Sequence, residues 1–357
     1  MVSCDGATSS GSTACRDTVT DALVIGGTGP SGARIVERLL AAGHRVTILH
    51  TGAHEVPFSG PVEHIHADPR SLDELQTALD KRHQDVAVAT SGRIRHVVDV
   101  LRGRVRRLVA ISGLPVYRGW LAPVGGGGIP VPIRESDAKE QDVSEYGHRV
   151  VQGERAVMDA HHAGDFEATI LRYTMVYGPY SYIPFEWFIV RRILDRRRAI
   201  ALEADGLMVP QRGYADNLAL AVMLALEHPA AAGRDYNVGD EQSLSVRSLV
   251  ELIADTLEHE WDLVPVPLRH SPCRNPFALR QNTLLDMSRI RAELGYRDAL
   301  GVIEATQETV RWLVEHPIGR ESAEEARLGS SAFDYPAEDL AIDRFRSFYD
   351  TLEERHV

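Results

Sequence analysis

Three glycines, Gly26, Gly29 and Gly32, have the spacing G-x-x-G-x-x-G between an apolar run and a helical pattern in DALVIGGTGPSGARIVERL. Glycine permits a tight turn and lets the backbone approach a pyrophosphate, and the following helix adds N–H donors and a positive dipole. Three glycines at this spacing are weak evidence by themselves, because a merely tight structural turn could explain them. Their position between a strand and a helix makes a dinucleotide-binding turn the more specific interpretation. The stretch predicts a dinucleotide-binding turn with Gly26, Thr28, Gly29, Pro30, Ser31 and Gly32 at the cofactor.

The second predicted strand determines how the cofactor ribose is recognised. It ends at His50 and Thr51, and no acid follows before Glu55. A carboxylate at this position would bind the ribose hydroxyls and repel a 2′-phosphate. Because His50 and Thr51 can donate hydrogen bonds to such a phosphate, we expect NAD(P) with a weak preference for NADP.

The third predicted strand, VEHIHAD, ends in further candidate residues. Asp68, followed by Pro69, is a candidate acceptor for the adenine amino group, and an N-cap of the next helix is nearly as plausible. His64 and His66 alternate on the strand without other clustered ligands in the sequence. We therefore expect structural roles for both histidines and no metal site.

From Asp21 onward the chain alternates apolar runs with helical patterns, which is typical of a parallel α/β sheet. This rhythm predicts a doubly wound, Rossmann-type parallel sheet with a smaller C-terminal substrate lobe. The strands are expected over 22–27, 44–50, 62–68, 85–90, 106–112 and 167–173, and the helices over 31–43, 71–82, 95–103 and from Tyr146.

We divide the chain into four parts. Residues 1–20 are small and polar and predict a disordered leader, not a secretory signal. The Rossmann domain is expected over 21–176 and an interleaved substrate-binding lobe over 177–317, followed by a tail over 318–357 with a docking helix. The long connection 115–144 is either a lid over the site or an excursion without consequence.

The composition restricts the class of protein. The chain has 357 residues, is 44% hydrophobic and contains no apolar run long enough to span a membrane. Its three cysteines suit a cytoplasmic protein and argue against a disulfide framework. The net charge of −12 disfavours nucleic acid as a partner. The basic runs 102–107 and 191–198 are expected to be solvated helix faces.

Several segments occur together in an informative order: GGTGPSG, HADP, AISGLPVYRG, EYGHRVVQGE, LRYTMVYGPY and QRGYADNLALAV. In this order they resemble the extended short-chain dehydrogenases of the NAD-dependent epimerase/dehydratase group, over about 21–317. The resemblance implies a Tyr-x-x-x-Lys pair on a helix and a Ser or Thr after the fifth strand. The tyrosine moves a proton while nicotinamide takes or gives a hydride, and the lysine holds ribose and lowers the pKa of the phenol. It also implies a homodimer and adds Ala89, Thr90, Tyr146 and Tyr173 to the cofactor contacts.

The chain departs from this pattern at the catalytic positions. Tyr146 and Glu154 fit the motif, but Val150 occupies the lysine position. The usual hydroxyl position falls on a glycine, with Ser112 just before it. Arg149 shares a helix face with Tyr146 and would favour the phenolate, although a solvent-facing arginine is the better alternative. The catalytic candidates are therefore Tyr146, Ser112 and Arg149.

The substrate is also expected to differ. Met175 stands near a position where nucleotide-sugar enzymes of the group often carry an Asn that grips the sugar diphosphate. A small polar metabolite, not a nucleotide sugar, is therefore expected. Arg212 matches an arginine that faces substrate phosphate or carboxylate, with an ion pair as the alternative. Tyr117 and Tyr177 are substrate-binding candidates near the expected cleft, each as plausibly a packing residue.

Three functions remain open on the sequence alone. The first is an NAD(P)-dependent epimerase/dehydratase-like or reductase-like enzyme with Tyr146 as acid/base. The second is a non-redox isomerase, lyase or cyclase on the same fold, with a structural or absent cofactor. The third is an RNA-binding protein like the chloroplast stem-loop binding relatives, which the acidic balance disfavours.

Overall fold

The computed structural model describes residues 19–120, 129–267, 275–277 and 281–353. The expected leader up to residue 18, the four-glycine run 125–128 and all three cysteines lie outside these residues.

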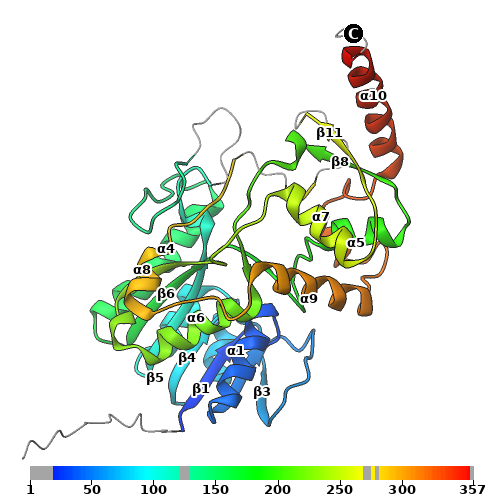
Figure 1. Cartoon of the computed structure of the whole chain (residues 1–357). Helices are drawn as coiled ribbons and strands as arrows, with labels where there is room; N and C mark the ends of the chain where they lie inside the picture. The colour runs from blue at the N-terminus through cyan, green and yellow to red at the C-terminus, as the bar shows by residue number, and fades with distance from the viewer. Residues whose placement is uncertain (1–18, 121–128, 268–274, 278–280, 354–357) are drawn as a thin grey trace, which may run out of the picture.

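A seven-stranded sheet forms the base of the molecule (Figure 1). Its strand order is β10-β6-β5-β4-β1-β2-β3, and every pair is parallel. From β1 the chain winds outward to β3 and then restarts on the other side at β4, so the switch point lies between β1 and β4. The predicted doubly wound fold is confirmed. The strands are β1 (Asp21–Ile25), β2 (Arg45–His50), β3 (Val62–His66), β4 (Gln84–Ala89), β5 (Val105–Gly113), β6 (Glu167–Tyr173) and β10 (Arg234–Val238).

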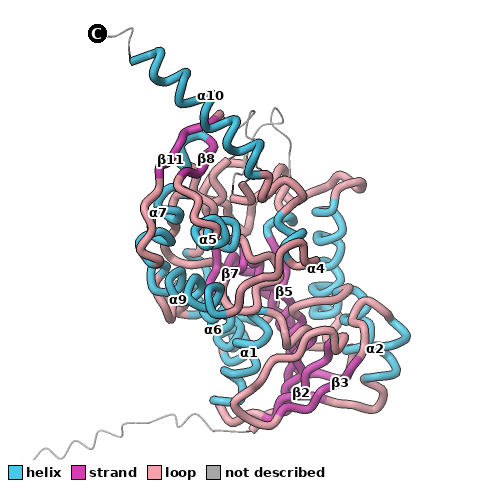
Figure 2. Tube along the Cα trace, turned by 90° about the vertical axis from the view of Figure 1, so that its right-hand side faces the viewer, coloured by secondary structure: helices cyan, strands magenta, loops and turns pink. Residues whose placement is uncertain are grey.

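Helices cover both faces of this sheet (Figure 2). α1 (Pro30–Ala41) and α6 (Ala215–Glu227) pack together on one face, and α2 (Leu72–Ala78), α3 (Ile94–Leu101) and α4 (Tyr146–His162) cover the other. α1 forms because Pro30 suits a first helical position and Ile35, Val36 and Leu39 recur at helical spacing toward the sheet. Burial of these two apolar layers holds the sheet in place.

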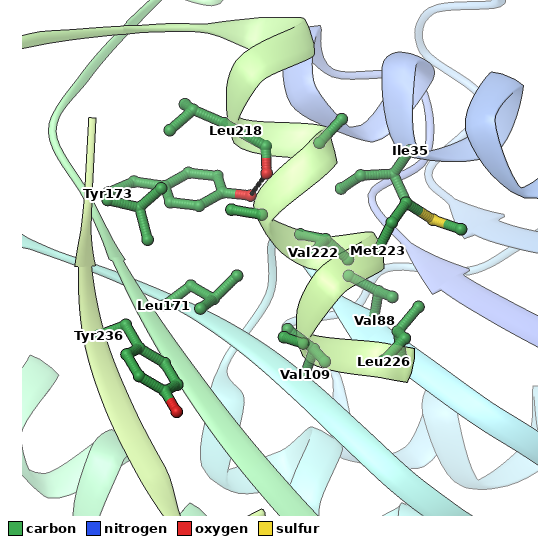
Figure 3. Close-up of a cluster of buried hydrophobic side chains, with 14 of the residues drawn as sticks. Ile35, Val88, Val109, Leu171, Tyr173, Leu218, Val222, Met223, Leu226 and Tyr236 are labelled. Carbon is green, nitrogen blue, oxygen red and sulfur yellow. Dashed lines mark hydrogen bonds between the residues drawn. The ribbon is translucent and has the colours of Figure 1, made fainter. Parts of the chain in front are cut away.

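Figure 3 shows the core beneath α6, where Leu218, Val222 and Leu226 point toward the strands. Tyr173 on β6 is buried there, and its hydroxyl donates to the Leu218 carbonyl at 3.1 Å. Burial raises the pKa of Tyr173. Both α6 and β10 therefore complete the Rossmann layers, although they follow residue 177 in the sequence.

A second lobe lies beyond the carboxyl edge of the sheet (Figure 1). Its core unites α5, α7 and α9. Two short parallel pairs, β7 with β9 and β8 with β11, accompany these helices. Its elements are β7 (Met175–Tyr177), α5 (Trp187–Leu194), β8 (Ala199–Glu203), β9 (Arg212–Tyr214), α7 (Val246–Thr256), β11 (Asp262–Val266) and α9 (Val302–Glu315), with α8 (Ser288–Leu294) beside β10.

The last helix, α10 (Tyr335–Glu353), begins against the second lobe and then projects from the molecule (Figure 1). Glu338 in its first turn is fully buried and forms an ion pair with the equally buried Arg192. The expectation that the basic run 191–198 is a solvated helix face is therefore wrong for Arg192. The run 102–107 also differs from the expectation, because Arg107 is buried and pairs with Glu167.

The connection between β5 and α4 turns inward in its described part. Ile133 is fully buried and bridges to Leu285, and the buried Glu135 accepts from the backbone N–H of Asn237 on β10. Residues 129–140 thus pack against the far edge of the sheet. Within the described residues, no helix combines the length and apolar character needed to cross a membrane.

Candidate active site

The glycine turn between β1 and α1 has the shape that the spacing predicts. Gly26 has φ +90°, which an L side chain rarely adopts. A Cβ on Gly32 would lie 2.2 Å from the Gly26 carbonyl oxygen, so the first turn of α1 packs directly on the loop. A Cβ on Gly29 would meet no atom closer than 3.8 Å, which leaves that backbone face accessible beside the α1 amino terminus.

A cleft of about 840 Å³ lies at the carboxyl ends of the strands around this turn. We call it the switch-point cleft. The predicted cofactor residues Gly26, Thr28, Gly29, Pro30, Ser31, Gly32, His50, Thr51, Asp68, Pro69, Thr90 and Tyr173 all line it. Ala89 and Tyr146 are not among its lining residues.

The cleft also contains residues that the sequence reasoning missed. Arg70 is exposed on its wall near Asp68, and Ser91 and Gly92 follow Thr90. Arg70 directly follows the HADP segment. The sequence did contain a signal for it: when no acid ends the second strand, a nearby arginine can bind a 2′-phosphate.

Asp68 is not the N-cap of α2. That position belongs to Ser71, whose hydroxyl accepts from the Glu74 backbone N–H. The Asp68 carboxylate accepts from the Arg70 N–H at 2.9 Å and lines the cleft. The N-cap alternative for Asp68 is therefore wrong, and its role as an acceptor for the adenine amino group stays a prediction.

His50 is 4% exposed, and its Nε2 lies 3.2 Å from Nδ1 of His64. Burial lowers the pKa of His50. Glu55 and His66 complete a group whose candidate ligand atoms lie within 4.8 Å of one another. The expectation that no other ligands cluster with His64 and His66 is therefore wrong, because the fold brings His50 and Glu55 to them.

A second pocket of about 710 Å³ lies between α3 and α4, and we call it the α3–α4 pocket. Tyr146, the first residue of α4, is 54% exposed and lines it together with Arg149 and Val150. The Arg149 guanidinium lies 5.3 Å from the centre of the Tyr146 ring. The pocket adjoins the switch-point cleft, because Ser112 and Thr90 line both.

The third catalytic candidate, Ser112, has a protein partner. Its hydroxyl donates to Glu154 Oε1 at 2.6 Å. Glu154 also accepts two hydrogen bonds from Arg172, which is 3% exposed and additionally pairs with Asp235. The structure thus brings Ser112 into a buried carboxylate–guanidinium network, whereas Tyr146 lies at the exposed end of α4.

Val150, at the family's lysine position, packs against the main hydrophobic core. A lysine is nevertheless found nearby in the sequence. Lys139 donates to the carbonyls of Glu135 and Asp137, and its Nζ lies 4.2 Å from the centre of the Tyr117 ring. Burial lowers the pKa of Lys139 to about 8, and the nearby Arg172 adds to the effect. Lys139 does not line either pocket.

The three substrate-binding candidates are buried instead of lining the cleft. Tyr117 is fully buried and donates to Asn237. Tyr177 donates to Asp240 at 2.7 Å, and Arg212 forms a 2.6 Å ion pair with Glu186. Each of the three has a protein partner. The geometry therefore agrees with the packing alternative for Tyr117 and Tyr177 and with the ion-pair alternative for Arg212.

A family model described as the NAD dependent epimerase/dehydratase family matches residues 22–102 and 95–239. The matched range contains the glycine turn, the switch-point cleft and α4.

The individual relatives share less than 30% of their residues with this chain over the matched regions. The chain is 26% identical over 215 residues to a dTDP-glucose 4,6-dehydratase of Streptomyces niveus, covering 59% of this chain and 58% of that protein. It is 28% identical over 259 residues to a dTDP-6-deoxy-L-talose 4-dehydrogenase (NAD(P)(+)) of Kitasatospora kifunensis, covering 68% and 81%. The chain thus spans less than two thirds of the dehydratase.

The fold is also found among solved structures. The Bordetella bronchiseptica enzyme WbmG in complex with NAD superposes with a TM-score of 0.67 at 18% identity, covering 85% of this chain and 96% of that one. At this identity the likeness concerns the fold alone.

Proposed function

Because the chain belongs to the NAD-dependent epimerase/dehydratase family, we propose that it is an enzyme that binds NAD(P) in the switch-point cleft, with a weak preference for NADP. The glycine turn carries this proposal. Gly29 leaves space for a pyrophosphate at the α1 amino terminus, whereas Gly26 and Gly32 pack too closely for any side chain. A bound nicotinamide would supply hydride transfer.

The chain's own residues divide the cleft between the parts of the cofactor. Backbone N–H groups of the first turn of α1 would hold the pyrophosphate, and Asp68 would accept from the adenine amino group. His50, Thr51 and Arg70 would face the ribose. Arg70, which follows β3, carries a fixed positive charge, and no carboxylate ends β2. Both features favour a 2′-phosphate on the ribose.

We propose epimerase/dehydratase-like or reductase-like chemistry on a small polar metabolite that is not a nucleotide sugar. Met175 lines the switch-point cleft, and a thioether cannot donate hydrogen bonds to a sugar diphosphate. Tyr146 would exchange the substrate proton as acid/base. Arg149, close to its ring, would stabilise the phenolate in place of the missing lysine.

A second function is favoured by a specific observation. The partly buried Val150 stands at the lysine position and the Ser112 hydroxyl is engaged by Glu154, so two groups of the usual proton machinery are absent or occupied. A non-redox isomerase, lyase or cyclase with a structural or absent cofactor needs only a proton donor such as Tyr146. This alternative predicts turnover without any change in the cofactor's redox state.

Cofactor binding is tested first, by calorimetry of the full chain with NAD⁺ and NADP⁺. We expect binding of both, tighter for NADP⁺, and an Arg70→Ala variant that loses this preference while retaining NAD⁺. If neither dinucleotide binds the folded protein, the proposed function is wrong.

Turnover is tested with NADP⁺ or NADPH and a panel of hydroxy, keto and nucleotide-linked sugars. Nicotinamide absorbance reports hydride transfer, and mass spectrometry of the sugars reports products without it. Tyr146→Phe should abolish turnover, whereas Tyr180→Phe, an exposed tyrosine outside both pockets, should not. Product formation by protein stripped of dinucleotide would favour the non-redox alternative, and an unchanged pH profile in Arg149→Met would remove Arg149.

A further inference from the structure

Three histidines and one glutamate gather at the β2–β3 edge of the sheet. We call His50, Glu55, His64 and His66 the histidine cluster. His50 and His66 end neighbouring strands and stand opposite each other in the parallel register. His64 lies two residues before His66 on the same side of β3. Glu55 comes from the loop between β2 and β3.

Three separations within the cluster, which involve both oxygens of Glu55, are close to those around a tetrahedral metal ion, whereas Nε2 of His50 lies 3.8 Å from Oε1 of Glu55. Nε2 of His50 and Nδ1 of His64 are 3.2 Å apart, and Nδ1 of His64 is 3.2 Å from Oε2 of Glu55. Nε2 of His66 is 3.3 Å from Oε1 of Glu55. Four ligands at the usual bond length to Zn²⁺, about 2.0–2.1 Å, are separated by about 3.3 Å in a tetrahedron.

The widest separation in the cluster is no more than 4.8 Å, so modest movement closes it. His66 and Glu55 are free to make that movement, because their side chains are 59% and 53% exposed. His50, at 4% exposure, fixes one corner of the site. The three rings are steeply inclined to one another, at 70°, 85° and 88°, so each pair meets edge to face.

Hydrogen bonds describe the metal-free form of the cluster. The Gly52 N–H lies 3.3 Å from Nδ1 of His50, which places the ring proton on Nε2, toward His64. Coordination through Nε2 requires this proton to move to Nδ1 and the long Gly52 contact to open. Metal uptake therefore needs a local adjustment at the start of the 51–61 loop.

We propose that the histidine cluster binds one divalent transition-metal ion, with Zn²⁺ the best match to three imidazoles and one carboxylate. Such a nitrogen-rich set suits zinc and its neighbours, whereas Mg²⁺ and Ca²⁺ require oxygen ligands. The ion fastens the 51–61 loop to the edge of the sheet. It also reverses the formal charge of the cluster from negative to positive beside His50, a residue of the cleft wall. The metal site shares His50 with the wall of the switch-point cleft, but metal uptake does not require that the proposed function be correct.

The test uses the full chain with its affinity tag removed and its metals stripped. Co²⁺ is titrated while the visible absorption typical of tetrahedral cobalt is followed, and Zn²⁺ retained after gel filtration is measured by mass spectrometry. About one ion per chain is expected. His64→Ala and Glu55→Gln should weaken uptake by roughly 100-fold or more, because even outer partners of metal ligands account for about 10- to 100-fold.

His83→Ala is the matched control, since His83 is exposed and lies outside the cluster. It should bind cobalt like the wild type, and Zn²⁺ should raise the melting temperature of both but not that of His64→Ala. The proposal is overturned if wild-type protein takes up no Co²⁺, if the bound cobalt is six-coordinate, or if folded His64→Ala binds as well as the control.

Discussion

Substituting Gly29 by alanine separates the role of the glycine turn in folding from its role in cofactor binding. Gly29 precedes α1 with φ −79° and ψ 174°, a conformation that alanine adopts freely. Its added Cβ would meet no protein atom closer than 3.8 Å. Alanine is a poorer residue than glycine before a helix, so we expect unfolding to become easier by only about 0.5–1 kcal/mol.

The same methyl group enters the space where a pyrophosphate would contact the backbone. A hydrogen bond to a charged group contributes roughly 1.5–3 kcal/mol. Losing one such bond from a backbone N–H to a phosphate oxygen weakens dinucleotide binding by about 10- to 150-fold. The expected variant is therefore folded but deficient in cofactor binding.

Calorimetry with NAD⁺ and NADP⁺, together with thermal unfolding, measures the two effects separately. Gly319→Ala is a matched control, because its Cβ would also find its nearest neighbour at 3.8 Å and Gly319 does not line the cleft. Unchanged affinity in folded Gly29→Ala would refute the placement of the pyrophosphate. Gly32→Ala should instead destabilise the protein, since its Cβ would lie 2.2 Å from the Gly26 carbonyl oxygen.

Three further predictions concern the interior and the assembly. Arg212→Met breaks a buried ion pair with Glu186 and should lower the free energy of unfolding, measured in urea, by about 3–5 kcal/mol. Arg320→Met at the surface should lower it by less than about 1 kcal/mol. Equal losses in the two variants would return Arg212 to the candidates for substrate binding. The pKa of Lys139 is lowered to about 8 in the folded protein from 10.5 for a free side chain. Between these pH values Lys139 is protonated only in the unfolded chain. The free energy of unfolding should therefore rise with pH in the wild type but not in Lys139→Met. Light scattering should give twice the chain mass of 39.4 kDa if α3 and α4 form the dimer contact that the family resemblance implies, and the single mass would contradict it.

Sequence patterns predicted the elements whose burial is continuous and local. β1 and β2 were located within a residue or two, because buried parallel strands are unbroken apolar runs. β10 was missed as a strand of the main sheet. It reads RDYNV, and its polar residues face partners from distant segments, as when Asp235 pairs with Arg172.

Long-range pairing also explains the errors at the site. The burial of Arg212 depends on Glu186, which lies 26 residues earlier, and no local motif reports that contact. The histidine cluster depends on the β2–β3 register, which sets His50 opposite His66. The glycine turn was predictable because its whole geometry resides in seven consecutive residues.

The ion pair between Arg192 and Glu338 has a consequence for biosynthesis. Arg192 is 0% exposed, and the carboxylate that balances it is supplied by a helix that begins 143 residues later, at Tyr335. During translation the Rossmann strands up to β6 can assemble early, but α5 cannot take its final place until α10 has left the ribosome. The second lobe therefore matures only after α10 has been synthesised, and nascent chains arrested before Glu338 should remain sensitive to protease around α5.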